Sequence, residues 1–263
     1  MRNFIFLLVL VLFIQCNPAP KTSIQAAVVS ARIEASEAGK TVMMQGGNAY
    51  DAMVATSFAL TVVYPVAGNI TGGGFFVYRT AKGESGTLDY REMAPLKATK
   101  NLYLDEDGDV IPKLSTVGGL AVGIPGAVAG ILEVHRKMGS LPLDQLLAPA
   151  IKLAEEGYIV SEKQAKSFKR YRDLFIEVNG EDTFFAQGHK AGDRIINLPL
   201  ANTLKAIAAK GEVGFYQGWV AEAMVNKTQA TGGILSLDDL KAYTPKWRNP
   251  VKFDYKDPYF LQC

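Results

Sequence analysis

A short charged segment, Leu88–Pro95 (LDYREMAP), offers the clearest chemistry in the sequence. It follows a strand-forming run, and charged groups at the end of an apolar strand are costly to bury unless they are paired or bind a ligand. Arg91 suits a carboxylate, because its planar guanidinium can donate two parallel hydrogen bonds to the two oxygens. The structural alternative is a surface ion pair of Arg91 with Asp89 or Glu92. The residues alone leave both interpretations open.

Other residue types that commonly perform catalysis form no pattern of this kind. His135 falls on the polar side of an amphipathic helix and His189 in a glycine-flanked loop, so neither is placed as a catalytic base. No serine lies in a G-x-S-x-G turn. Gly72–Gly74 lacks Walker and Rossmann spacing, and its structural reading is a close backbone approach. No Cys/His cluster has metal-ligand spacing, so the sequence predicts neither a metal nor a cofactor.

Composition describes an ordinary globular chain. It has 263 residues, 48% of them hydrophobic and 21% charged, with a net charge of +2. Such a length can bury a sizeable core. Lysines and arginines are scattered among acids, which argues against nucleic acid as a partner.

The N-terminus predicts export from the cytoplasm. The apolar run Phe4–Ile14 would rise about 16 Å as a helix, which is short for a bilayer and typical of a secretory signal over residues 1–16. Cys16, directly after this run, resembles the lipidated cysteine of bacterial lipoproteins, although Gln15 departs from the small residue usual before it. A plain signal peptide with a free cysteine is the alternative. We expect a periplasmic or lipid-anchored protein, with a linker over residues 17–29.

Periodicity and capping signals predict a mostly helical chain. Helices are expected over residues 31–45, 49–63, 125–137, 142–156, 161–175, 198–209, 218–228 and from 236 onward. Two strands, Phe75–Tyr78 and Thr87–Tyr90, flank a turn and predict a hairpin, and residues 245–255 read as extended. This order predicts an α/β (α+β) fold with an antiparallel sheet. The helix over 49–63 is apolar nearly all round, so we expect it in a core that needs more sheet than the chain supplies.

Three segments in order resemble the γ-glutamyltranspeptidase family: Gly46–Ala52 (GGNAYDA), Ala67–Phe75 (AGNITGGGF) and Leu88–Pro95. Later stretches fit the same register, namely GIPGAVAG at 123–130, PAIKLA at 149–154 and GGIL at 232–235. The resemblance implies an N-terminal-nucleophile hydrolase fold, a four-layer αββα sandwich made by a precursor that cleaves itself. Residues 30–263 would be the N-terminal part of the large subunit, and the sandwich would be incomplete here.

The resemblance also implies the reaction. A threonine exposed by self-cleavage, with its own α-amine as base, would attack the γ-glutamyl amide of glutathione or a related compound. Backbone N–H groups would hold the oxyanion, and the glutamyl group would pass from the threonine ester to water, an amino acid or a peptide. The arginine of the family's D-[FY]-R-E motif holds the α-carboxylate, a role that falls on Arg91, with Asp89 and Glu92 bracing it. Thr228 and Thr231 lie at a polar helix end without the context of the nucleophile.

The family continues into a P-P-S-S-G-G segment and then the catalytic threonine, and this sequence contains neither. We therefore expect the chain to be inactive alone, with the small subunit as the partner in a complete protein. A catalytically dead secreted lipoprotein, serving as a scaffold or binding module, is the alternative. Other γ-glutamyl amides or cephalosporin side chains also remain open as substrates.

Overall fold

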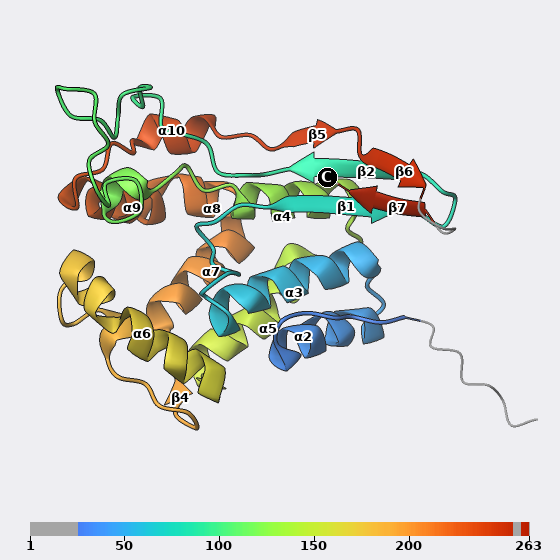
Figure 1. Ribbon diagram of the computed structural model, residues 1–263. Helices are drawn as coiled ribbons and strands as arrows, with labels where there is room; N and C mark the ends of the chain where they lie inside the picture. The colour runs from blue at the N-terminus through green and yellow to red at the C-terminus, as the bar shows by residue number, and fades with distance from the viewer. Residues whose placement is uncertain (1–25, 255–258, 263) are drawn as a thin grey trace, which may run out of the picture.

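The computed structural model describes residues 26–254 and 259–262 (Figure 1). The predicted signal segment, Cys16 with its expected lipid and most of the linker lie outside the described residues. Within the described part, no helix is both long and apolar enough to cross a bilayer.

The helices lie close to the residue ranges that the sequence predicted. In chain order they are α2 (Ile33–Met44), α3 (Ala49–Val63), α4 (Ala127–Met138), α5 (Leu143–Glu156), α6 (Glu162–Asn179), α7 (Leu198–Lys210), α8 (Val213–Tyr216), α9 (Gly218–Ala230) and α10 (Leu237–Ala242), with short 3₁₀ turns η1 (Gly119–Ala121) and η2 (Phe184–Ala186). Capping fixes several starts: Asn48 and Asp51 form a capping box at α3, and Ser236 forms one with Asp239 at α10. Among the helices of the described residues, the sequence did not predict the short α8 and the two 3₁₀ turns.

The strands are short and antiparallel. They are β1 (Phe75–Arg79), β2 (Ser85–Asp89), β3 (Tyr158–Ile159), β4 (Arg194–Ile195), β5 (Lys246–Arg248), β6 (Val251–Asp254) and β7 (Tyr259–Gln262). The predicted hairpin is β1–β2, and β5 joins it in a sheet of order β1-β2-β5. The extended segment predicted over residues 245–255 contains β5 and β6, whereas β3, β4 and β7 were not predicted. β3 and β4 have only two residues each, which leaves no alternation to detect.

One face of the β1-β2-β5 sheet packs on helices. Phe76, Leu88 and Trp247 lie opposite one another in the register and share that face. The Tyr50 ring of α3 lies 6.1 Å from that of Phe76, and Trp247 Nε1 donates to Glu133 of α4 at 2.7 Å. The opposite face carries the polar side chains at the end of β2.

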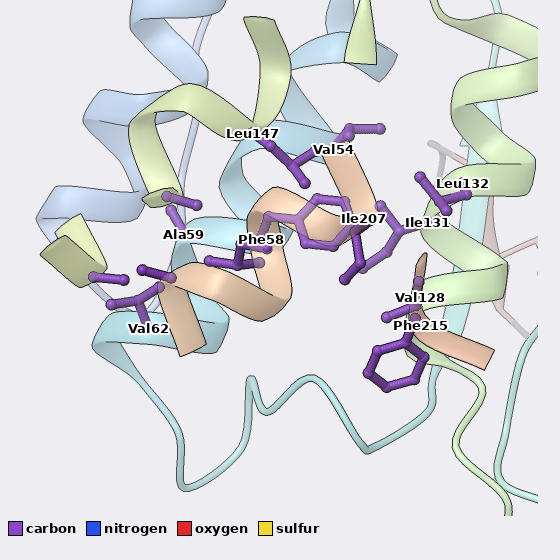
Figure 2. Packing of buried hydrophobic residues seen from close by; sticks show 14 of the residues in the cluster. Val54, Phe58, Ala59, Val62, Val128, Ile131, Leu132, Leu147, Ile207 and Phe215 are labelled. Carbon is purple, nitrogen blue, oxygen red and sulfur yellow. The ribbon is translucent and has the colours of Figure 1, made fainter. Parts of the chain in front are cut away.

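Helix α3 lies in the main core, as its apolar sequence predicted. Phe58 of α3 is 0% exposed. Figure 2 shows its side chain gathered with residues from α3, α4, α5, α7 and α8: Val54, Ala59, Val62, Val128, Ile131, Leu132, Leu147, Ile207 and Phe215. The expectation that α3 needs further sheet to cover it was wrong. Helices α2, α4 and α5 supply the cover within the described residues, because helices also bury an apolar surface.

A buried carboxylate holds one end of this helical layer. Asp51 is 0% exposed and accepts hydrogen bonds from Asn48 N at 2.9 Å, Ser140 N at 2.9 Å and Ser140 Oγ at 2.5 Å. Burial acts to raise the pKa of Asp51, but the hydrogen bonds from Ser140 and Asn48 outweigh it and the pKa is lowered. Asp51 thus ties the α2–α3 turn to the α4–α5 turn while remaining ionised.

Candidate functional site

The guanidinium of Arg91 lies just beyond the last residue of β2. Its side chain is 55% exposed, and Nη2 lies 3.2 Å from Glu92 Oε2. Within the described part of the chain this ion pair is the one polar contact of the guanidinium. Of the two predicted acids, Glu92 is therefore the one that pairs with the Arg91 side chain.

Asp89 supports Arg91 through the backbone instead. Its Oδ1 accepts a hydrogen bond from Arg91 N at 3.1 Å, and its Oδ2 accepts one from Arg248 Nε at 2.8 Å. Burial acts to raise the pKa of Asp89, but these hydrogen bonds and the charge of Arg248 lower it overall. Arg248 was not singled out in the sequence, because the two residues become neighbours only when β5 pairs with β2.

The carbonyl of Arg91 is held from α10. Tyr243, the residue after this helix, donates its hydroxyl to Arg91 O at 2.8 Å and is 7% exposed. Burial, with the nearby charges of Asp89 and Glu92, raises the pKa of Tyr243 to about 12. The phenol therefore stays protonated and remains a donor at neutral pH. Both backbone polar groups of Arg91 are thereby bonded.

The glycine-rich loop closes against the same segment. Gly74 and Tyr90 exchange backbone hydrogen bonds at 3.0 and 3.3 Å, and Gly72 O accepts from Gly126 N at 2.9 Å. A Cβ at Gly73 would stand 2.6 Å from Tyr90 O and 2.7 Å from Glu92 N, closer than real Cβ contacts. The predicted close backbone approach is confirmed, and it requires glycine at position 73.

Further contacts fix the segment beyond Arg91. Met93 pairs with Ile124 in a β-bridge. Leu96 N donates to Asp239 Oδ1 at 2.7 Å, and Asp239 is 1% exposed. Burial acts to raise the pKa of Asp239, but the hydrogen bonds from Leu96 and Ser236 outweigh it and lower the pKa. A backbone held at residues 89, 91, 93 and 96 presents one half-exposed guanidinium, which is the arrangement needed to bind a carboxylate.

The remaining candidates have structural contacts. The Nε2 atoms of His135 and His189 donate to the carbonyls of Leu141 (2.8 Å) and Phe184 (3.0 Å). Thr228 and Thr231 lie at the C-terminal end of α9, as predicted. Thr228 is 7% exposed and donates its hydroxyl to Met224 O, and Thr231 donates its hydroxyl to Lys227 O. No group of three or more His, Cys, Asp or Glu side chains in the described part could hold a metal ion.

The chain is similar to known proteins over most of its length. Residues 35–263 match the family model described as "Gamma-glutamyltranspeptidase". The chain belongs to the γ-glutamyltranspeptidase family. The glutathione hydrolase proenzyme of Pseudomonas sp. (strain A14) is 42% identical to it over 249 residues, covering 91% of this chain and 42% of the relative. The corresponding proenzyme of Escherichia coli (strain K12) is 38% identical over 241 residues, which are 90% of this chain and 42% of the relative.

Solved structures give the same answer for the fold. The Helicobacter pylori γ-glutamyltranspeptidase superposes with a TM-score of 0.88 at 46% identity, covering 92% of this chain and 70% of that chain. The fold is thus that of the N-terminal-nucleophile hydrolases, as expected, and the family is one of enzymes. The chain spans 42% of the length of both curated relatives.

Proposed function

We propose that this chain is the N-terminal part of a γ-glutamyltranspeptidase that cleaves γ-glutamyl amides such as glutathione. Water, an amino acid or a peptide would take the glutamyl group from a γ-glutamyl-threonine ester. The observation that carries the proposal is Arg91, whose backbone is held by Asp89 and Tyr243 while its side chain stays 55% exposed. Its guanidinium would bind the α-carboxylate of the glutamyl group through two parallel hydrogen bonds.

The two acids would take different parts in that binding. Glu92 Oε2 is buried, has no hydrogen-bond donor among the described residues, and lies 3.2 Å from Arg91 Nη2. Its charge would orient the guanidinium without occupying all of its five N–H donors. Asp89 would keep the Arg91 N–H bonded and would be neutralised by Arg248. Neither acid is assigned to the substrate.

The nucleophile would be the threonine that the family uses, and no threonine of these 263 residues has the required sequence context. We therefore propose that the 263-residue chain alone neither cleaves itself nor turns over substrate. The small subunit made by self-cleavage would be its partner in a complete protein. The proposed secretory signal and the proposed lipid on Cys16 would place the protein outside the cytoplasm.

The test begins with the purified chain and γ-glutamyl-p-nitroanilide, measuring the absorbance of released p-nitroaniline. We expect no release, and release above the buffer blank would refute the proposed inactivity. The coding region beyond codon 263 is then sequenced and translated in all forward frames. A P-P-S-S-G-G segment followed by a threonine would support an interrupted or longer enzyme, whereas unrelated sequence would favour a scaffold.

If a longer product is encoded, its kinetics test Arg91 directly. Arg91→Gln should raise KM about 100-fold or more, because it leaves a substrate carboxylate without its charged partner. Arg91→Lys should recover part of this loss, since it keeps the charge but not the planar fork. Arg79→Gln, an exposed arginine on β1, is the matched control and should leave KM unchanged. An unchanged KM in Arg91→Gln would remove Arg91 from the substrate site.

One observation favours the scaffold alternative. The helical layer around α3 already buries its apolar residues within the described part of the chain. A secreted scaffold would melt cooperatively as a soluble monomer, while an interrupted enzyme would aggregate through apolar side chains such as Met93 (43% exposed) and Leu96 (75% exposed). Thermal unfolding followed with light scattering separates the two outcomes.

A further inference from the structure

A concave site lies on α6, away from the Arg91 segment. In Figure 1, α6 and the sheet strands β1 and β2 occupy opposite sides of the molecule. The pocket has a volume of about 410 Å³. Its walls are α6 and the loop after η2: Ala165, Lys166, Phe168, Lys169, Arg172, Phe185, Gly188, His189, Lys190 and Ala191. A volume of this size is in the range of small-molecule sites, about 300–1,000 Å³.

The floor of the pocket is aromatic and held in place. Phe168 is 7% exposed, and its ring centroid lies 5.9 Å from that of Phe185 and 5.7 Å from that of His189. His189 Nε2 donates to Phe184 O at 3.0 Å, which fixes the orientation of the imidazole. The packed rings form a rigid apolar surface against which a flat group could stack.

The rim is cationic. Lys166, Lys169, Arg172 and Lys190 line the pocket, and no carboxylate does. Arg172 Nε donates to Ala186 O at 3.0 Å, which holds its guanidinium at the edge. The closest ion-pair partner of Arg172, Asp173, is 3.9 Å away with a fully exposed side chain. In the described part of the chain, the ammonium groups of the three lysines form no ion pair.

This accumulation of charge is a local feature of α6. The segment from Lys163 to Arg172 (KQAKSFKRYR) contains five cations and no acid. The prediction that lysines and arginines are scattered among acids therefore fails over residues 163–172, where the overall charge of +2 conceals a run of cations. Like charges gathered around an apolar hollow repel one another, and an anion bound there relieves that repulsion. An apolar floor beneath a cationic rim therefore suits a ligand that has both an apolar body and an anionic group.

We propose that this pocket binds a small aromatic anion, with its ring against Phe168 and Phe185 and its carboxylate, sulfonate or phosphate group toward the lysines. The ring is favoured over an aliphatic body because the floor itself is aromatic. The site is independent of the proposed reaction at Arg91. It would act as a separate ligand site on the outer helix of the fold.

Isothermal titration calorimetry of the purified protein with benzenesulfonate tests the proposal. Methanesulfonate supplies the charge without the ring, and benzyl alcohol the ring without the charge. We expect benzenesulfonate to bind about tenfold or more tightly than either, and its affinity to fall as NaCl is raised. Equal affinity for methanesulfonate would reduce the site to a general anion patch, and absence of benzenesulfonate binding would overturn the proposal.

Matched variants localise the binding. The double change Lys166→Gln and Lys169→Gln removes two rim charges, and Lys82→Gln with Lys227→Gln removes two exposed charges elsewhere. Each pair takes the net charge from +2 to 0, since two positive charges are lost. The rim pair should weaken benzenesulfonate about tenfold, and the distant pair should leave it unchanged. Equal weakening by both pairs would show nonspecific attraction and reject the site.

The floor is tested separately with Phe185→Leu, which keeps an apolar side chain but removes the ring. We expect the preference for benzenesulfonate over methanesulfonate to fall several-fold while the affinity for methanesulfonate stays the same. Circular dichroism melting of each variant checks that the fold is retained. An unchanged preference in a folded Phe185→Leu protein would contradict the proposed stacking.

Discussion

The fold buries the charged side chain of Asp51 and leaves that of Arg91 largely exposed. The Asp51 side chain is 0% exposed, and the fold uses its carboxylate to join two helix turns. At Arg91 the fold bonds the backbone N–H and carbonyl, while the side chain is 55% exposed and its guanidinium has one polar contact among the described residues, the ion pair with Glu92. The Asp51 carboxylate thus forms all its contacts within the protein, whereas Arg91 is fixed through its backbone and its side chain stays available for the proposed ligand.

The largest loss of stability should come from the helical core. Phe58→Ala should lower the free energy of unfolding by about 4 kcal/mol, because it leaves a cavity at a 0% exposed position between several helices. Phe75→Ala, at a position 50% exposed on β1, is the matched control and should cost less than about 1.5 kcal/mol. Urea unfolding measures both, and equal losses would show that the core is not centred on α3.

Asp51→Ala should cost somewhat less, about 3 kcal/mol, because it leaves Ser140 and the start of α3 with buried unpaired donors. Asp107→Ala is the control, since Asp107 is an exposed acid in a surface turn. Its loss should stay within about 0.5 kcal/mol. A small effect of Asp51→Ala would mean that water replaces the carboxylate and that the two turns are not joined through it.

The same carboxylate predicts a pH dependence. The pKa of Asp51 in the folded chain is below its unfolded value, so the folded state binds this proton less tightly. The stability it contributes is present above the unfolded pKa of about 4 and is lost as the pH falls through the folded pKa. Asp51→Asn should therefore flatten the loss of stability below about pH 4, and Asp107→Asn should leave it steep. Identical acid curves for the two would contradict the assignment.

At the candidate site the smaller effect should come from the buried hydroxyl. Tyr243→Phe should cost about 1 kcal/mol, because Arg91 O loses its donor. Tyr171→Phe, at a position 40% exposed on α6, should cost nearly nothing. Equal thermal shifts for the two variants would show that the hydroxyl of Tyr243 does not hold the Arg91 backbone.

The smallest effect should come from the guanidinium itself. Arg91→Gln should change the free energy of unfolding by no more than about 0.5 kcal/mol, because its ion pair with Glu92 is partly exposed. Arg136→Gln breaks an ion pair with Glu133 that is also partly exposed, and its effect on the free energy of unfolding is the reference value. A loss of unfolding free energy as large as that of Asp51→Ala would show that Arg91 is a structural residue, and the two regions would then not differ in this respect.

Local patterns in the sequence predicted most of this fold. The helix starts at Asn48, Ser161 and Ser236 are true side-chain caps, and the β1–β2 hairpin was expected. What the sequence could not supply were contacts between distant segments. Arg248 reaches Asp89 only through strand pairing, so no spacing rule joins the two residues.

The prediction that α3 needs further sheet to bury it was wrong for the same reason. An apolar helix indicates that something buries it, but its sequence does not say whether a sheet or other helices do so. The charged segment at positions 88–95 was recognisable from the sequence, and the family resemblance predicted the role of Arg91 within it. The support from Tyr243 and Asp239 required the structure, because both residues otherwise read as parts of an ordinary short helix and its end.

The contact between Tyr243 and Arg91 also sets an order of assembly during translation. It joins residues 152 positions apart, and the contact of Asp239 with Leu96 spans 143. At about 5–20 residues per second, roughly 7–30 s pass between synthesis of the arginine and synthesis of its support. Throughout that interval the nascent chain carries the motif without the partners that shape it. The arginine is thus made early, and its surroundings are completed only when the segment after α9 has emerged from the ribosome.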